Sequence, residues 1–120
     1  MADAAVDPAS AGLITGTVTY RQRIAVPKGA IVVAELFDMS DAAAPARMAR
    51  SRTVADGQVP FRFQLSYDRS RIDPGRPYAV QARIVVDRAA WFVTDRPVPV
   101  LTHGNPSTVA LLLRQASARE

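Results

Sequence analysis

The sequence contains no cysteine, and it has only one histidine and one tryptophan among its 120 residues. The absence of cysteine excludes disulfides, thiolate metal sites, thiol nucleophiles and a lipid thioether within these residues. A metal site or a catalytic triad would therefore have to be built around His103, which stands next to the turn residues Gly104 and Asn105. Because a bound metal needs several convergent ligands, we predict neither a metal nor a cofactor.

The sequence also lacks the motifs of nucleophilic and nucleotide chemistry: it has no G-x-S-x-G, no P-loop and no G-x-G-x-x-G. Two aspartate pairs are the remaining candidates for acid–base chemistry, namely Asp38 with Asp41 and Asp68 with Asp73. Each of these residues lies in a predicted loop or directly beside one, where aspartate commonly caps a turn. The sequence therefore predicts a binding module and not an enzyme.

Basic residues outnumber acidic residues by 15 to 11, which gives a net charge of +4 and a calculated isoelectric point near 10.3. Along most of the chain arginines alternate with aspartates, and this pattern predicts a surface of mixed charge. The one local excess is Arg47, Arg50 and Arg52, and on a regular strand Arg47 points away from the other two. The charge pattern therefore predicts no nucleic-acid partner.

Alternation of apolar and polar residues predicts about seven β-strands and no helix. The predicted strands cover residues 14–20, 30–38, 47–54, 59–67, 78–87, 91–94 and 107–113. The Asp56-Gly57 turn predicts a hairpin of the third and fourth strands, and Pro60, which has no amide hydrogen, places the fourth strand at an edge or beside a bulge. This spacing is typical of an antiparallel β-sandwich of the immunoglobulin or transthyretin type. We predict the sandwich over residues 13–114, between flexible tails at 1–12 and 115–120.

Two short segments supply the candidate site residues. The corner before the fifth strand, with Pro74, Gly75 and Tyr78, is similar to the tyrosine corner of fibronectin-type sandwiches, where the tyrosine hydroxyl bonds to the backbone of the corner. We predict a structural role for these three residues. Trp91 and Phe92 are adjacent, so on a strand they point to opposite faces and one of them is exposed. The exposed one is the candidate binding residue, because aromatic side chains anchor interfaces.

Several segments in the predicted strands and turns carry a family resemblance. They are ITGTVTYR at 14–21, Ile24, PKGA at 27–30, LFD at 36–38, GQVPFRF at 57–63, YD at 67–68, IDP at 72–74, YAV at 78–80, ARI at 82–84, TD at 94–95 and VLTHGNP at 100–106. In this order they resemble the YbaY/YscW family of bacterial envelope lipoproteins, which includes pilotin-like proteins of type III secretion. The resemblance covers residues 13–113.

The resemblance implies a β-sandwich that is exported to the periplasm and anchored to the outer membrane through an N-terminal lipidated cysteine. The residues given contain neither the leader nor that cysteine, so we expect both to precede them in the native precursor and the domain as given to be soluble. The resemblance also implies a non-enzymatic domain that binds a protein segment of an outer-membrane or secretion component, through a sheet edge or an apolar groove. The alternative is a small-ligand or carbohydrate-binding sandwich that uses Trp91 or Phe92. Because the matching motifs are those of turns and core strands, no site residue is carried over from the family.

Overall fold

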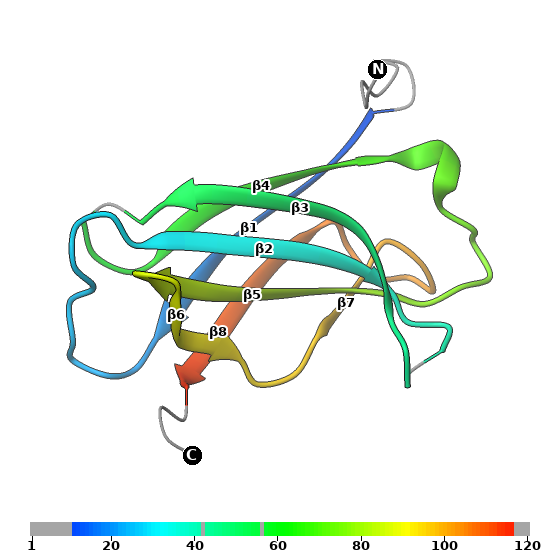
Figure 1. The fold of residues 1–120 in the computed structure, drawn as a ribbon. Helices are drawn as coiled ribbons and strands as arrows, with labels where there is room; N and C mark the ends of the chain where they lie inside the picture. Colours follow the sequence, from blue (N-terminus) through cyan, green and yellow to red (C-terminus); the bar gives the residue numbers. More distant parts are fainter. Residues whose placement is uncertain (1–10, 42, 56, 117–120) are drawn as a thin grey trace.

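The computed structural model describes residues 11–41, 43–55 and 57–116, which fold into eight β-strands and one short 3₁₀ helix, η2 (Arg69–Arg71) (Figure 1). The strands are β1 (Ala11–Tyr20), β2 (Ile31–Asp38), β3 (Ala46–Val54), β4 (Phe61–Asp68), β5 (Tyr78–Val86), β6 (Ala89–Thr94), β7 (Val98–Val100) and β8 (Thr108–Gln115). The predicted tails lie mostly outside the described residues, although β1 already begins at Ala11 and β8 includes Gln115.

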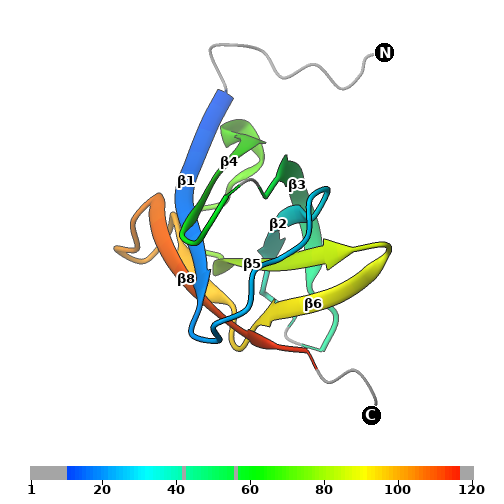
Figure 2. The ribbon, with the colours of Figure 1, turned by 90° about the vertical axis from the view of Figure 1, so that its left-hand side faces the viewer.

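All eight strands belong to one curled sheet with the order β3-β2-β5-β6-β8-β1-β4, and β7 adds to β5 next to β6. Neighbouring strands are antiparallel except β1 and β8, which run parallel. Seen from the side in Figure 2, the sheet curls around its interior, so that its two end strands, β3 and β4, approach each other. The protein is all-β, as predicted, but the antiparallel sandwich of the immunoglobulin type is corrected to a mixed, nearly closed barrel.

The reason for this correction is that alternation describes a single strand and not its neighbours. A strand buried on one face shows the same period of two in a barrel and in a sandwich. β1 and β8 are far apart in the sequence, and their parallel pairing cannot be predicted from the alternation of apolar and polar residues within either strand.

The predicted hairpin of β3 and β4 is wrong. In the described residues β3 pairs only with β2, and β4 pairs only with β1; Asp56 of the predicted turn lies outside the described residues. A cavity of about 370 Å³ lies between the two strands, lined by Ser51, Arg52, Thr53, Arg62, Phe63 and Gln64. Pro60 directly precedes β4, which is an edge strand, as the missing amide hydrogen predicted.

The interior of the barrel is filled by apolar side chains from nearly every strand. The largest fully buried ones are Tyr78, Phe92, Ile14, Leu36, Leu65, Ile84, Leu111, Val18, Val32, Val80 and Val100. Burying each of these side chains stabilises the fold by about 1.5–3 kcal/mol. Strand β5 is central to this core, because it pairs with β2 along one side and with both β6 and β7 along the other.

Gly16 allows β1 to keep neighbours on both sides. It stands opposite Val109 in the parallel pair with β8 and opposite Phe63 in the antiparallel pair with β4. A Cβ atom at this position would collide with the backbone oxygen of Val109 and with the Phe63 ring, 2.9 Å away. The sheet can therefore curl this tightly only with glycine at position 16.

We expect Gly16→Ala to lower the free energy of unfolding by about 1–3 kcal/mol, the usual cost of inserting a methyl group where there is no space. Urea unfolding followed by circular dichroism measures this loss. The control is Thr17→Ala, on the other face of β1, for which we expect a loss below about 1 kcal/mol. Equal losses in the two variants would contradict a special role for Gly16.

Candidate functional site

An apolar groove opens where β6 and the end of β8 meet the segment that follows β1. It has a volume of about 420 Å³ and is lined by Ile24, Ala89, Ala90, Trp91, Phe92, Gln115 and Ala116. Two large apolar side chains remain partly exposed there, since Ile24 is 39% and Trp91 is 37% exposed. The volume falls within the range of about 300–1,000 Å³ that is usual for ligand sites.

A β-bulge at Trp91 shapes one wall of this groove. Phe92 stands opposite Ile84 of β5, whereas Val85 stands opposite Ala90, so Trp91 is the extra residue of the bulge. A bulge bends the strand and turns the side chain of the extra residue away from the regular direction. The prediction that one of the two adjacent aromatic residues is exposed is confirmed, because Phe92 is fully buried and Trp91 is not.

Tyr20, the last residue of β1, holds both the floor and the rim of the groove. Its ring stacks on Phe92 with the ring centroids 3.9 Å apart and the planes 9° from parallel. Its hydroxyl donates a hydrogen bond to the carbonyl oxygen of Ile24 at 2.6 Å. Burial raises the pKa of Tyr20, so the hydroxyl stays protonated and remains a donor. The groove is therefore already formed in the free protein.

A second, more polar cavity of about 300 Å³ lies beside the groove and shares Ile24 with it. Its lining is Tyr20, Gln22, Arg23, Ile24, Ala25, Gly57, Gln58 and Val59. An occupant anchored on the exposed face of Ile24 would therefore meet apolar atoms on one side and amide and guanidinium groups on the other.

The predicted structural residues lie at the opposite end of β5. β6 pairs with β5 from Arg83 to Val86, whereas Tyr78 begins β5 and pairs with Val100 of β7. The Tyr78 hydroxyl accepts a hydrogen bond from the backbone N–H of Asp73 at 2.9 Å.

The turn that precedes Tyr78 is closed by the backbone of Asp73 and Arg76. The Gly75 N–H donates to the Asp73 carboxylate, and the Arg76 N–H donates to the Asp73 carbonyl, each at 2.9 Å. Pro74 stands exposed within this turn. The structure thus brings Pro74, Gly75 and Tyr78 together, away from Trp91 and Phe92.

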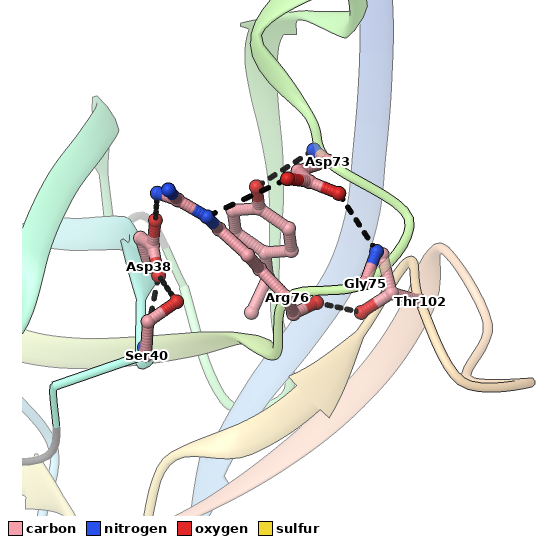
Figure 3. Close-up of polar contacts among 7 residues, drawn as sticks. Asp38, Ser40, Asp73, Gly75, Arg76 and Thr102 are labelled. Carbon is pink, nitrogen blue, oxygen red and sulfur yellow. Dashed lines mark hydrogen bonds and ion pairs between the residues drawn. The ribbon is translucent and has the colours of Figure 1, made fainter.

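Arg76 joins this corner to two other parts of the barrel, as Figure 3 shows. Its guanidinium lies 3.1 Å from the Asp38 carboxylate at the end of β2 and 3.6 Å from the Asp73 carboxylate. Its carbonyl oxygen accepts a hydrogen bond from the Thr102 hydroxyl at 2.6 Å. The Asp38 carboxylate also accepts two bonds from Ser40, from its N–H at 2.9 Å and its hydroxyl at 2.6 Å.

The aspartates considered for acid–base chemistry are thus engaged in structural contacts. Asp68 caps η2 by accepting from the N–H and the hydroxyl of Ser70, and Asp41 accepts from the Ala43 N–H. His103 is exposed in a turn, where its φ is 59°. Within the described part of the chain, no three metal-ligating side chains gather into a site. The same residues include no helix with the length and hydropathy of a membrane span.

The structure corrects the predicted orientation of Arg47. The pairing of β3 with β2 shifts by one residue, so that Met48 forms a bulge. The extra residue reverses the alternation, and Arg47 therefore lies on the same outer face as Arg50 and Arg52. A regular period of two, which the prediction assumed, does not hold across a bulge.

Two functional features of the groove could not be found from the alternation pattern. Ile24 lines the groove and Tyr20 supports it because of contacts between distant segments, and the bulge at Trp91 follows from pairing with β5. One signal for Ile24 was available, since it is an isolated large apolar residue between charged and small ones, outside the predicted strands.

The structural role of Tyr78 is a prediction that Tyr78→Phe tests. Removal of the hydroxyl leaves the Asp73 N–H without its acceptor, so we expect the loss of about 1 kcal/mol, or about 3–5 °C in Tm. The control is Tyr67→Phe, because the Tyr67 hydroxyl has no hydrogen-bond partner among the described residues. Differential scanning calorimetry measures both, and an unchanged Tm in Tyr78→Phe would show that the corner does not depend on this bond.

The pH dependence of stability tests the contacts of Asp38. Hydrogen bonds from the Ser40 hydroxyl and N–H, aided by Arg76, lower the pKa of Asp38 below its usual value. The ionised carboxylate therefore contributes stability above the ordinary pKa of about 3.9, and this contribution is lost as the pH falls through the lower value of the folded state.

We expect Asp38→Asn to be less stable than the native chain at neutral pH and to lose less stability between about pH 6 and about pH 3. Hydrogen bonds from Ser70 lower the pKa of Asp68 in the same way, so Asp68 accounts for part of the pH dependence of stability that remains in Asp38→Asn. Urea unfolding at several pH values gives both curves. Parallel curves for the two proteins would contradict the assignment.

Three comparisons place the chain among known proteins. The family model described as "Type III secretion system lipoprotein chaperone (YscW)" matches residues 9–113. The uncharacterized lipoprotein YbaY of Escherichia coli strain K12 is 34% identical over 93 residues, which are 76% of this chain and 49% of that protein. The chain thus spans about half the length of this curated relative.

Among solved structures, an alternative pilotin from the type II secretion system of Vibrio cholerae superposes with a TM-score of 0.84 at 38% sequence identity. The match covers 88% of this chain and 97% of the pilotin chain. The family model therefore spans nearly all the described strands, and the structural match extends over the same barrel. The chain belongs to the YbaY/YscW pilotin-like family, which its sequence motifs resemble.

Proposed function

We propose that this chain is a non-enzymatic envelope domain that binds an apolar segment of a partner protein in the groove beside Trp91. The observation that carries the proposal is the pair of exposed side chains, Ile24 and Trp91, above a floor that Phe92 and Tyr20 already hold in place. Exposed apolar surface around a formed cavity is typical of an interaction site.

The family supports a protein as the partner. The matching family model is described as a lipoprotein chaperone, and the structural relative is a pilotin of a secretion system. For this chain we infer a partner from the outer membrane or a secretion system, and a location in the periplasm with an N-terminal lipid anchor in the native precursor. Because the chain spans about half of its curated relative, these inferences concern the domain and not a whole protein of that length.

The lining of the groove favours a protein segment over a sugar. A sugar site needs several hydrogen-bonding side chains beside the aromatic ring, and Gln115 is the one polar side chain among the residues that line the groove. The apolar side chains of a bound segment would instead lie against Ile24, Trp91 and the alanines of β6. The carbohydrate-binding alternative therefore has the weaker support.

The proposal is tested first by site-specific crosslinking in the envelope of the native host. A photo-crosslinking amino acid at Ala90, on the groove, keeps Trp91 and Ile24 intact, and the same group at Leu13 provides a control on an exposed apolar position of β1. We expect one protein to be crosslinked from Ala90 and not from Leu13, and mass spectrometry to locate the crosslink in an apolar segment.

The affinity for a synthetic peptide of that segment is then measured by calorimetry. We expect Trp91→Ala and Ile24→Ser each to weaken binding about tenfold or more, because partly buried apolar anchors dominate such interfaces. Leu13→Ser, which alters a side chain that is 46% exposed, should change the affinity less than about twofold. Saturable sugar binding that is lost in Trp91→Ala, without any protein crosslink, would contradict the proposal and favour the alternative.

A further inference from the structure

The outer face of β3 carries three arginines in line, beside an edge of the sheet. Arg47, Arg50 and Arg52 share this face because of the bulge at Met48. Arg62 of β4 lies across the seam, since Arg52 and Arg62 line the same cavity between the two strands. All four of these arginines are exposed, so a basic surface surrounds the edge of β3.

One carboxylate balances part of this charge. Glu35 of β2, whose side chain is only 10% exposed, lies 3.3 Å from the guanidinium of Arg47 and 2.7 Å from that of Arg83 on β5. The other three arginines around the edge are in no ion pair with any described residue. The surface therefore carries a net positive charge that attracts anionic groups, and exposed charges of this kind are screened by salt.

The backbone of β3 is also open to a partner. β3 is an end of the sheet, so the backbone groups on its far side pair with no strand of the described chain. Figure 1 shows β3 and β4 close together near their connection and far apart toward the start of β3 and the end of β4. Within the seam, the Ser51 hydroxyl is buried without a hydrogen-bond partner among the described residues. The first half of β3 is therefore an uncovered edge.

Charges and bulges on an edge strand commonly protect it from pairing with other chains. Here the charges have a single sign, so they repel a second copy of β3 but attract an acidic strand. We propose that the first half of β3 binds an extended, acidic protein segment by strand addition, with its carboxylates opposite Arg47 and Arg50 and close to Arg52. This site lies apart from the groove at Trp91, and it stands whether or not the groove binds a partner.

The geometry of a strand gives the expected pattern of the segment. Alternate residues share a face about 6.6–7 Å apart, and side chains opposite each other on paired strands have Cβ atoms about 4.5–5.5 Å apart. Acidic residues at every second position would therefore meet the arginines, and guanidinium binds carboxylate with two parallel hydrogen bonds. An anionic membrane would meet the same charges without using the backbone of β3, which makes the two kinds of partner distinguishable.

The test uses a fluorescein-labelled peptide of nine residues in which Glu alternates with Thr, so that part of the peptide can pair with the uncovered half of β3 and the rest can extend beyond it. A second peptide has the same composition with the glutamates in one block. We expect the alternating peptide to bind more tightly, and its affinity to fall about tenfold in Arg50→Gln/Arg52→Gln and to fall as salt rises. The matched control, Arg21→Gln/Arg96→Gln, removes the same charge after β1 and β6 and should bind within about twofold of the native chain.

Amide hydrogen exchange gives a readout that charge alone would not change. The bound peptide should slow exchange in β3 and leave β6 and β8 unaffected, because strand addition occupies free backbone groups. Equal binding of both peptides without protection of β3 would overturn the proposal, as would binding only to vesicles that contain phosphatidylglycerol. If neither peptide binds and Arg50→Gln/Arg52→Gln self-associates in analytical ultracentrifugation, the arginines only guard the edge and the proposal is wrong.

Discussion

The parallel pairing of β1 with β8 is the constraint on which the rest of the structure depends. β8 already pairs with β6, and β1 already pairs with β4, so this contact curls the sheet and leaves β3 and β4 as its two ends. Gly16 permits it, because any side chain there would hold Val109 away. The same pairing places Tyr20 opposite Leu113, near the end of β8, and so brings the Tyr20 ring onto Phe92 of β6.

The corner that precedes β5 and the groove beside the other end of β5 differ in chemistry. At the start of β5, the hydrogen bonds and ion pairs of Asp38, Asp73 and Arg76 satisfy one another, so these three side chains have little left to offer a partner. At the other end, the contacts of Tyr20 fix the groove from beneath while Trp91 and Ile24 stay exposed above it. The exposed parts of Trp91 and Ile24 contribute little to folding, and a partner that covers them gains the benefit of burying this remaining surface.

How much could be predicted from the sequence depended on the range of the interactions. All strands except β7, which lies outside the predicted ranges, follow from period two, and the edge position of β4 follows from Pro60; both signals are local. Alternation also predicted that one of Trp91 and Phe92 is exposed, although the bulge at Trp91 sets the direction of that side chain. The closure of the sheet and the failure of β3 and β4 to pair depend on contacts between distant segments, which local patterns do not encode. Bulges cannot be predicted from local patterns for the same reason, since the extra residue of a bulge is defined only relative to the strand with which it pairs. The sequence therefore predicted that one of Trp91 and Phe92 is exposed, but it placed Arg47 on the wrong face of β3.

Both proposed binding surfaces depend on such a bulge, one at Trp91 in β6 and one at Met48 in β3, whereas β2 pairs with β5 in regular register between them. The two surfaces are thus separate, but the distance between them is limited by the size of the molecule. The longest dimension of the molecule is 40 Å, and about 12 extended residues span that distance. One partner chain with an apolar stretch and an acidic stretch could therefore reach both surfaces, and the second contact would then be intramolecular. Two contacts of modest affinity, joined in this way, hold a partner far more tightly than either one alone.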